Sequence, residues 1–171
     1  MWLIPHANPP VRSRRYGLLL AVALLLAGCA APPRTVRIAL VGPFEGRYAA
    51  TGYAAFTPFR QALQDGMRAG GFGGYQVSFV AYNDNGDPHF AERVARDVVI
   101  DSEVVAVIGH LRADTTRAAL PVYEAAGLAV IDGTLPVERQ VALVLATIGR
   151  EVAAGREVTR AGVRDAMNKV K

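Results

Sequence analysis

The sequence predicts an α/β domain built on a parallel, doubly wound sheet with helices on both faces. From residue 35 onward, short apolar runs typical of strands alternate with amphipathic segments typical of helices. One run, Val104–Ile108, is apolar at every position, which is typical of a strand covered on both faces. A chain that is 51% hydrophobic and 20% charged also suits a single compact domain better than a disordered one.

The first half of this domain is expected to contain two strands and a crossover helix. The first apolar run ends at Gly42 and Pro43, where a turn should follow. Phe56, Phe59 and Leu63 recur at helical spacing and indicate one apolar face. The expected elements are a strand over 36–41, a helix over 54–65 and, after a glycine-dense turn over 70–74, a strand over 75–82.

The second half continues the alternation. Asp87 followed by Pro88 predicts a helix N-cap and a first-turn proline. Asp114 is expected to cap the next helix and Gly127 to close it. The expected elements are a helix from 88 to 101 with Phe90, Val94 and Val98 on one face, a strand over 104–108, a helix over 115–126 and a strand over 128–131.

Two amphipathic helices are expected after Pro136. The first carries an apolar stripe, and the second is capped by Thr159. The apolar positions are Val141, Val144, Leu145, Ile148 and Val152 in the first helix, and Val163, Met167 and Val170 in the second. We expect both helices to pack on the sheet, because nothing else in the chain can cover their apolar stripes.

The N-terminal segment has the pattern of an export signal. Arg12, Arg14 and Arg15 form a basic region and account for most of the net charge of +4. The apolar run over 18–27 that follows is too short to cross a bilayer as a helix, which takes about 20 apolar residues. Residues 1–28 are therefore predicted to be a signal peptide that is removed.

This leader ends in Leu26-Ala27-Gly28-Cys29, which resembles a bacterial lipobox. The resemblance implies that the Cys29 thiol takes a diacylglyceryl group and that residues 29–34 form a lipidated tether. The alternative is a buried core cysteine behind an ordinary export signal. Ser13-Arg14-Arg15 also resembles a twin-arginine signal, although general secretion is the favoured route. Either route leads to the extracytoplasmic face of the cell envelope.

The sequence disfavours nucleic-acid binding and catalysis. Beyond Cys29 the basic residues are mixed with acidic ones, without a basic and aromatic surface for a nucleic acid. No Gly-x-Ser-x-Gly, P-loop or dinucleotide fingerprint occurs, so neither an enzyme nor a cofactor is expected. His89 and His110 with Asp84 and Asp87 could be imagined as a metal set, but their spacing does not support one.

Ligands of parallel sheets bind at the carboxyl ends of the strands, where loops meet helix N-termini. The loops that should matter here are 42–51, 83–87, 109–116 and, beside them, 132–134. Tyr48 and Tyr53 in or near the first loop fit a cleft wall and an ordinary surface equally well. His110 is expected to be a hydrogen-bonded structural residue rather than a catalytic one.

Several segments together resemble one family in order and spacing. They are Val36-Arg37-Ile38-Ala39-Leu40-Val41-Gly42-Pro43, then Gly52, Tyr82-Asn83-Asp84 with Asp87-Pro88, Val107-Ile108-Gly109-His110, and Leu120-Pro121-Val122-Tyr123-Glu124-Ala125-Ala126-Gly127. Over about residues 35–135 the chain is similar to the first lobe of a Leu/Ile/Val-type periplasmic binding protein, the receptor component of branched-chain amino-acid ABC importers.

The resemblance implies a single lobe of a type 1 periplasmic binding fold. Residues 140–171, with Ala161-Gly162-Val163-Arg164-Asp165-Ala166, are similar to a helical stretch found much later in the family, after the chain returns from the second lobe. The second lobe is therefore expected to be missing. The expected domains are a ligand-binding lobe over 35–135 and C-terminal helices over 136–171 that pack on it.

The family holds the ligand carboxylate on the loop after the third strand, which implies the ligand-binding residues of this chain. The family's ligand-binding serine falls at Ala113, and Asp114 places a negative charge where a carboxylate would lie. Thr115 and Thr116 could donate hydrogen bonds, with Arg112 offsetting Asp114. The expected ligand-binding set is Ala113, Asp114, Thr115, Thr116 and, in the other contact loop, Gly133 and Thr134. Helix capping is the alternative role for Asp114, Thr115 and Thr116.

The sequence thus predicts a lipid-anchored solute-binding lipoprotein of a branched-chain amino-acid-type ABC transporter. Its expected partners are a small ligand (an amino acid or a related small carboxylate), a transporter permease and the membrane. Binding by one lobe alone is expected to be weak or absent, because good sites cover about 70 to 90% of a ligand's surface. The alternatives are a membrane-anchored interaction module and a vestigial lobe without ligand binding of its own.

Overall fold

The computed structural model describes residues 34–69, 72–131 and 135–169. The centre of this part of the chain is a four-stranded parallel sheet in the order β2-β1-β3-β4. The strands are β1 (Arg34–Gly42), β2 (Tyr75–Asn83), β3 (Val104–Gly109) and β4 (Ala129–Ile131). The chain moves to one side of β1 for β2 and to the other side for β3, so the strand order reverses between β1 and β3. The predicted α/β class is confirmed.

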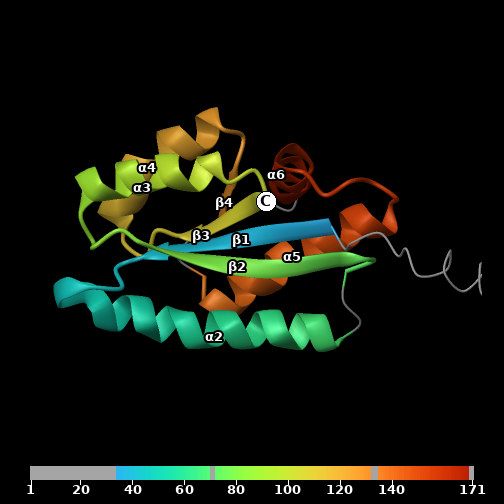
Figure 1. Cartoon of the computed structure of the whole chain (residues 1–171), viewed down its shortest axis with the longest axis horizontal. Helices are drawn as coiled ribbons and strands as arrows, with labels where there is room; N and C mark the ends of the chain where they lie inside the picture. Colours follow the sequence, from blue (N-terminus) through green and yellow to red (C-terminus); the bar gives the residue numbers. More distant parts are fainter. Residues whose placement is uncertain (1–33, 70–71, 132–134, 170–171) are drawn as a thin grey trace, which may run out of the picture. The chain divides into compact units, whose positions relative to one another are not determined.

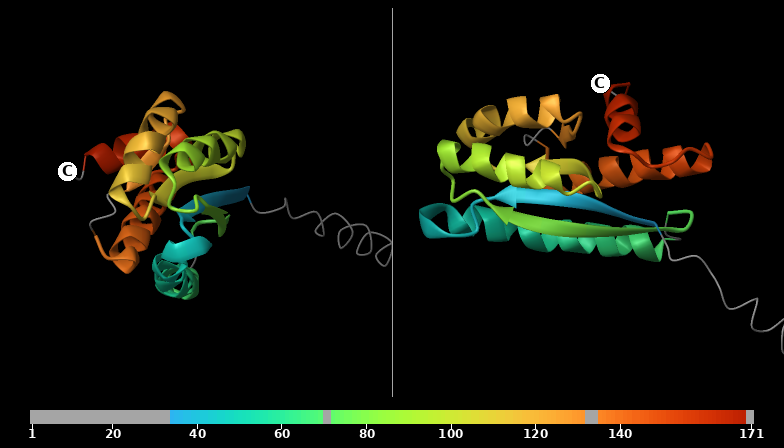
Figure 2. Two further views of the ribbon diagram at one scale, coloured as in Figure 1. Left: turned by 90° about the vertical axis from the view of Figure 1, so that its left-hand side faces the viewer. Right: turned by 45° about the horizontal axis from the view of Figure 1, so that its top comes forward.

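Helices cover both faces of the sheet (Figures 1 and 2). Helices α2 (Ala49–Arg68) and α5 (Val137–Ala153) lie on one face, and α3 (Pro88–Ile100) and α4 (Ala113–Ala125) lie on the other. A short 3-10 turn, η1 (Gly46–Tyr48), precedes α2, and α6 (Arg160–Asn168) packs beside α5 and against β3 and β4. No helix in the described ranges combines the length and the apolar character needed to cross a membrane.

Each face of the sheet has its own apolar core. Ile38, Leu40 and Ile108 point toward α2, α5 and α6, where Phe59, Val141, Val144, Ile148 and Val163 meet them. Ala39, Val41 and Val107 point the other way, toward Val94, Val98, Ala119 and Tyr123 of α3 and α4. Every residue of β3 is buried, as its continuous apolar run predicted. Because successive side chains of β1 point to opposite faces of the sheet, this strand contributes residues to both cores.

The predicted helix ends at Asp87, Gly127 and Thr159 are confirmed. An Asp87 carboxylate oxygen accepts the N–H groups of His89 and Phe90 at 2.8 and 3.0 Å, with Pro88 in the first turn. The Thr159 hydroxyl accepts the Gly162 N–H at 3.1 Å. Gly127 adopts a φ of 67°, which lets Leu128 donate back to the Tyr123 carbonyl at 2.9 Å and end α4.

Helix α2 is longer than predicted. It begins at Ala49 rather than at residue 54 and ends at Arg68 rather than at Asp65. The extra first turn lacks an apolar stripe, which is why periodicity did not detect it. Gly52 is buried in that turn against the Pro43 carbonyl, where a Cβ would clash, so the absence of a side chain lets the helix approach the end of β1.

Arg160 joins α6 to the end of α3 and the start of β3. Its guanidinium donates to the carbonyl oxygens of Val99 at 3.0 Å and Val104 at 2.8 Å, and also to the carbonyl of Asp101. The Asp101 carboxylate in turn pairs with Arg37 at 2.7 Å. This set of contacts joins the first residue of α6 to the turn between α3 and β3, and it holds the C-terminal helices to the sheet.

Candidate functional site

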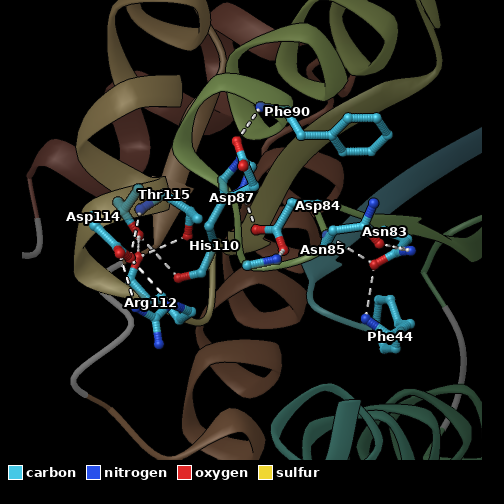
Figure 3. Close-up of polar contacts among 12 residues, drawn as sticks. Phe44, Asn83, Asp84, Asn85, Asp87, Phe90, His110, Arg112, Asp114 and Thr115 are labelled. Atoms are coloured by element: carbon cyan, nitrogen blue, oxygen red, sulfur yellow. Dashed lines mark hydrogen bonds and ion pairs between the residues drawn. The ribbon is translucent and has the colours of Figure 1, made fainter. Parts of the chain in front are cut away.

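The carboxyl ends of β1, β2 and β3 meet at one edge of the sheet. Gly42 is in register with Asn83, and Val41 is in register with Gly109. The loops that leave these strands therefore start side by side, and Figure 3 shows their polar side chains converging. This is the edge at which the sequence predicted the ligand site.

Asn83 and the main chain join the first two loops. The Oδ1 atom of the Asn83 side chain accepts the N–H of Phe44 at 2.9 Å and the N–H of Asn85 at 3.0 Å (Figure 3). The Asp84 N–H donates to the Gly42 carbonyl at 3.0 Å. These hydrogen bonds fix the course of the chain after β1 relative to the turn after β2.

Asp84, His110 and Tyr123 form a buried chain of hydrogen bonds below the loops. His110 Nδ1 lies 2.7 Å from Asp84 Oδ2, and His110 Nε2 lies 3.0 Å from the Tyr123 hydroxyl. The other Asp84 oxygen accepts the Gly86 N–H at 2.9 Å. The three residues are 0%, 2% and 0% exposed, and burial, followed by the Asp84 charge, raises the pKa of Tyr123.

This burial decides the role of His110. An Asp-His-Tyr chain could relay protons, but a substrate cannot reach a histidine whose side chain has no exposed surface. The predicted structural role of His110 is confirmed. Within the described ranges, no three His, Cys, Asp or Glu residues gather closely enough to hold a metal ion, and Asp87 serves as a helix cap instead.

The third loop differs from the prediction at Asp114. The residue at the cap of α4 is Arg112, in extended conformation, whereas Asp114 is the second residue of the helix. The helix starts earlier than predicted because the Thr116 N–H donates to the Arg112 carbonyl at 2.9 Å, which makes Arg112 the N-cap. The Thr115 and Thr116 hydroxyls donate to the same carbonyl. Asp114 nevertheless accepts the Thr115 N–H at 2.9 Å, a favourable place for a carboxylate near a helix N-terminus.

Arg112 holds Asp114 with two hydrogen bonds. Its Nε and Nη2 atoms donate to the two carboxylate oxygens at 3.1 and 2.8 Å. The Arg112 guanidinium keeps the pKa of Asp114 below its usual range. The same guanidinium lies 4.0 Å from the centre of the Tyr48 ring, so Arg112 also joins this loop to the first one. Nothing local in the sequence indicated the contact with Tyr48.

The predicted hydroxyl donors are engaged within their own loop. The Thr115 hydroxyl donates to the Arg112 carbonyl at 3.0 Å, and Thr115 is buried. The Thr116 hydroxyl donates to the carbonyls of Arg112 and His110 at 2.8 and 2.9 Å. Ala113, the first residue of α4, is exposed at the edge. Gly133, Thr134 and Cys29 lie outside the described residues.

Comparison with known proteins agrees with this architecture. Residues 35–142 match the family model described as periplasmic binding protein. The Leu/Ile/Val-binding protein of Escherichia coli K12 is 35% identical over 142 residues, which cover 77% of this chain and 38% of that protein. A Pseudomonas aeruginosa protein that binds leucine, isoleucine, valine, threonine and alanine is 34% identical over 143 residues, covering 80% and 38%.

Two solved structures are similar as well. The branched-chain amino acid transporter substrate-binding protein LivJ of Streptococcus pneumoniae, in complex with isoleucine, is 28% identical with a TM-score of 0.53, covering 57% of this chain and 28% of that one. A putative branched-chain amino acid ABC transporter protein of Rhodospirillum rubrum is 26% identical with a TM-score of 0.56, covering 63% and 32%.

The fold and its edge loops define an α/β lobe of the kind found in extracytoplasmic binding proteins. The chain belongs to the periplasmic binding protein family, as its match over residues 35–142 shows. The proteins to which it is similar are amino-acid-binding components of transporters rather than enzymes. The chain spans 38% of the length of the curated relatives quoted above.

The buried network yields a prediction about stability. Replacing His110 with Ala leaves the Asp84 carboxyl buried without its partner, which should cost about 3–5 kcal/mol of unfolding free energy. Tyr123→Phe removes one hydroxyl and should cost about 1 kcal/mol. Denaturant unfolding of both variants measures the difference, with Tyr53→Phe at an exposed ring as the control. A His110→Ala variant as stable as Tyr53→Phe would contradict the role given to the network.

Proposed function

We propose that this chain supplies one ligand-facing lobe of an extracytoplasmic solute-binding lipoprotein that serves an ABC transporter of the branched-chain amino-acid type. The receptor to which this lobe belongs captures a small solute without catalysis and passes it to a permease. The observation that carries the proposal is the family match over residues 35–142, which spans β1 to the start of α5 and all of the joined edge loops.

Residues 35–135 and 136–171 are proposed to be two parts of this same lobe. The packing of α5 on α2 and of α6 on β3 and β4 supports this. Relatives with this fold are longer than the present chain, which covers 38% of their length. In the family two lobes close on the ligand, so one lobe alone covers too little ligand surface for tight binding.

The ligand is proposed to meet the exposed N-terminus of α4 at Ala113, with Asp114, Thr115 and Thr116 behind it and Gly133 and Thr134 as the second contact loop. Backbone N–H groups at a helix start attract a carboxylate. Here the Asp114 carboxylate already accepts hydrogen bonds from the Thr115 N–H and from the Arg112 guanidinium. A free amino-acid carboxylate would have to displace it, and this competition adds to the weakness expected of a single lobe.

An interaction module is the second candidate, and exposed apolar side chains near the edge favour it. Tyr53 on α2 is 62% exposed and Leu135 before α5 is 42% exposed, although both are large and apolar. Exposed apolar surface often marks a protein contact. In this version the lobe has no ligand of its own, and its edge meets another protein such as a permease. A vestigial lobe without ligand binding of its own is the remaining alternative.

The lipid anchor gives a test of location. Cys29→Ser removes the thiol that would be acylated, so the diacylglyceryl mass on residue 29 should be lost. Fractionation of cells that produce each form, with mass spectrometry of the mature N-terminus, measures this. A conservative change near the lipobox, Ala31→Ser, should stay membrane-bound. A mature N-terminus without the lipid mass in the unchanged chain would contradict lipidation.

The edge loop gives a test of ligand capture. In calorimetric titration with leucine, the unchanged chain should bind weakly or not at all. The double variant Ala113→Ser with Asp114→Ser restores the family's serine and removes the competing carboxylate. It should therefore bind leucine at least about tenfold more tightly, the effect of one hydrogen bond gained.

Glu124→Ser at the other end of α4 serves as the control, because it removes a carboxylate from an exposed position outside the loop. Submillimolar binding by the unchanged chain, or no gain in the double variant, would contradict the proposed role of this loop.

A further inference from the structure

The two edges of the sheet differ in length. At one edge, β4 has only 3 residues, and a strand this short offers little for another strand to pair with. At the other edge, β2 has 9 residues, Tyr75-Gln76-Val77-Ser78-Phe79-Val80-Ala81-Tyr82-Asn83. It pairs with β1 in an unbroken parallel register along its whole length. No described strand pairs with the outer side of β2.

Edge strand β2 lacks the features that keep exposed edges apart. Natural edge strands commonly carry a charged residue, a proline or a bulge that prevents pairing with another chain. The β2 segment contains no charged residue, no proline and no glycine, and its aromatic residues, Tyr75, Phe79 and Tyr82, favour strand structure. The outer N–H and C=O groups of β2 can therefore pair with a further strand.

Helix α3 flanks this edge with a row of side chains along one side of the helix. The row consists of Phe90, Arg93, Asp97 and Ile100, which recur at spacings of three and four residues. Phe90 and Val80 of β2 pack on the same core, and the opposite side of α3 meets α4, so the row lies toward the β2 edge (Figure 1). Ile100 is 79% exposed although it is large and apolar.

The two charges of this row have no ion-pair partner within the described chain. Arg93 and Asp97 are both exposed, and the ion pair of α3 joins Arg96 to Glu92 instead, at 2.7 Å. Arg93 and Asp97 lie one helical turn apart. When α3 meets an antiparallel copy of itself, each Arg93 therefore comes opposite the Asp97 of the other copy. The row is complementary in charge to its own two-fold copy.

Helix α2 flanks the same edge on the other face of the sheet. Phe56 is half-buried and meets Phe79 of β2 edge to face, with the ring centres 5.5 Å apart. Met67 follows about three turns later on the same side of α2 and is 37% exposed. Partly exposed apolar side chains therefore border β2 on both faces, and such surface often marks a protein contact.

We propose that β2 pairs in antiparallel orientation with the β2 strand of a second copy of this chain, so that the two sheets become one. A two-fold axis perpendicular to the sheet places each of the helices α2 and α3 beside its own copy. This brings Arg93 to the Asp97 of the second copy and covers Ile100 and Met67. The paired strands run along the side of the sheet, so the proposal does not depend on ligand capture at the α4 loop.

Sedimentation velocity of the purified full chain across the micromolar range should show a concentration-dependent dimer. Ala81→Lys places a charge at an exposed position of β2 and should raise the dissociation constant by about tenfold or more, because a charge on an edge strand opposes pairing. Ala125→Lys makes the same change at an exposed position of α4 and should leave the dimer unchanged. Association through the apolar N-terminal run would be equal in all three forms.

An exchange of charges on α3 tests the two-fold arrangement. Arg93→Asp sets like charges opposite each other and should weaken the dimer by about tenfold. The double variant Arg93→Asp with Asp97→Arg restores opposite charges between the copies and should recover the affinity of the unchanged chain. These positions are exposed, so the pair decides the question if Ala81→Lys does not fold, as judged by circular dichroism.

Three results would overturn the proposal. The first is an unchanged chain that stays monomeric. The second is a dimer as tight in a folded Ala81→Lys variant as in Ala125→Lys, which would place the contact on another surface. The third is a double variant that dimerises no more tightly than Arg93→Asp alone.

Discussion

The edge of the sheet depends on one buried interaction, the hydrogen-bonded chain of Asp84, His110 and Tyr123. Each residue comes from a different segment: the turn after β2, the loop after β3, and the last turns of α4. All three side chains are buried, so a polar atom of this network that lost its hydrogen-bond partner would have no water to replace it, and the fold would be destabilised. The network therefore favours the arrangement of the three segments in which these groups meet.

The polar groups of the loops above this network form hydrogen bonds and contacts with one another. Asn83 binds the main chain of the first loop, and Arg112 lies between the Tyr48 ring and the Asp114 carboxylate. Thr115 and Thr116 close the third loop on its own carbonyls. Such an edge is well ordered in advance for binding. It also uses internally the donors that a free carboxylate would need, and this is the physical reason to expect weak amino-acid binding.

Local sequence patterns predicted what local physics decides. The alternation of apolar runs predicted the parallel sheet, and the continuously apolar run predicted the central strand β3. Asp87, Thr159 and Gly127 were recognised because capping involves residues only a few positions apart. The start of α2 was missed because its first turn is held by packing of Gly52 rather than by an apolar stripe.

The polar contacts of the site could be predicted only in part. The loops were expected at the correct edge, but the partners of His110 lie 26 and 13 positions away, and no pattern in the sequence pairs them. Asp114 was expected at the cap, because the rule that favours Asp there does not anticipate that the Arg112 carbonyl accepts the first helical N–H, from Thr116. That β2 lies at an edge of the sheet, without a described strand on its outer side, became visible only from the strand order.

Native-state hydrogen exchange tests most directly whether the buried network holds the edge loops. The Gly86 N–H donates to Asp84, and the Leu40 N–H lies in the core strand β1. We predict that in the unchanged chain the Gly86 amide is protected nearly as well as the Leu40 amide, and that in a His110→Asn variant only Gly86 falls to the level of a locally opening loop. A Gly86 amide that already exchanges like an open loop in the unchanged chain would contradict the account.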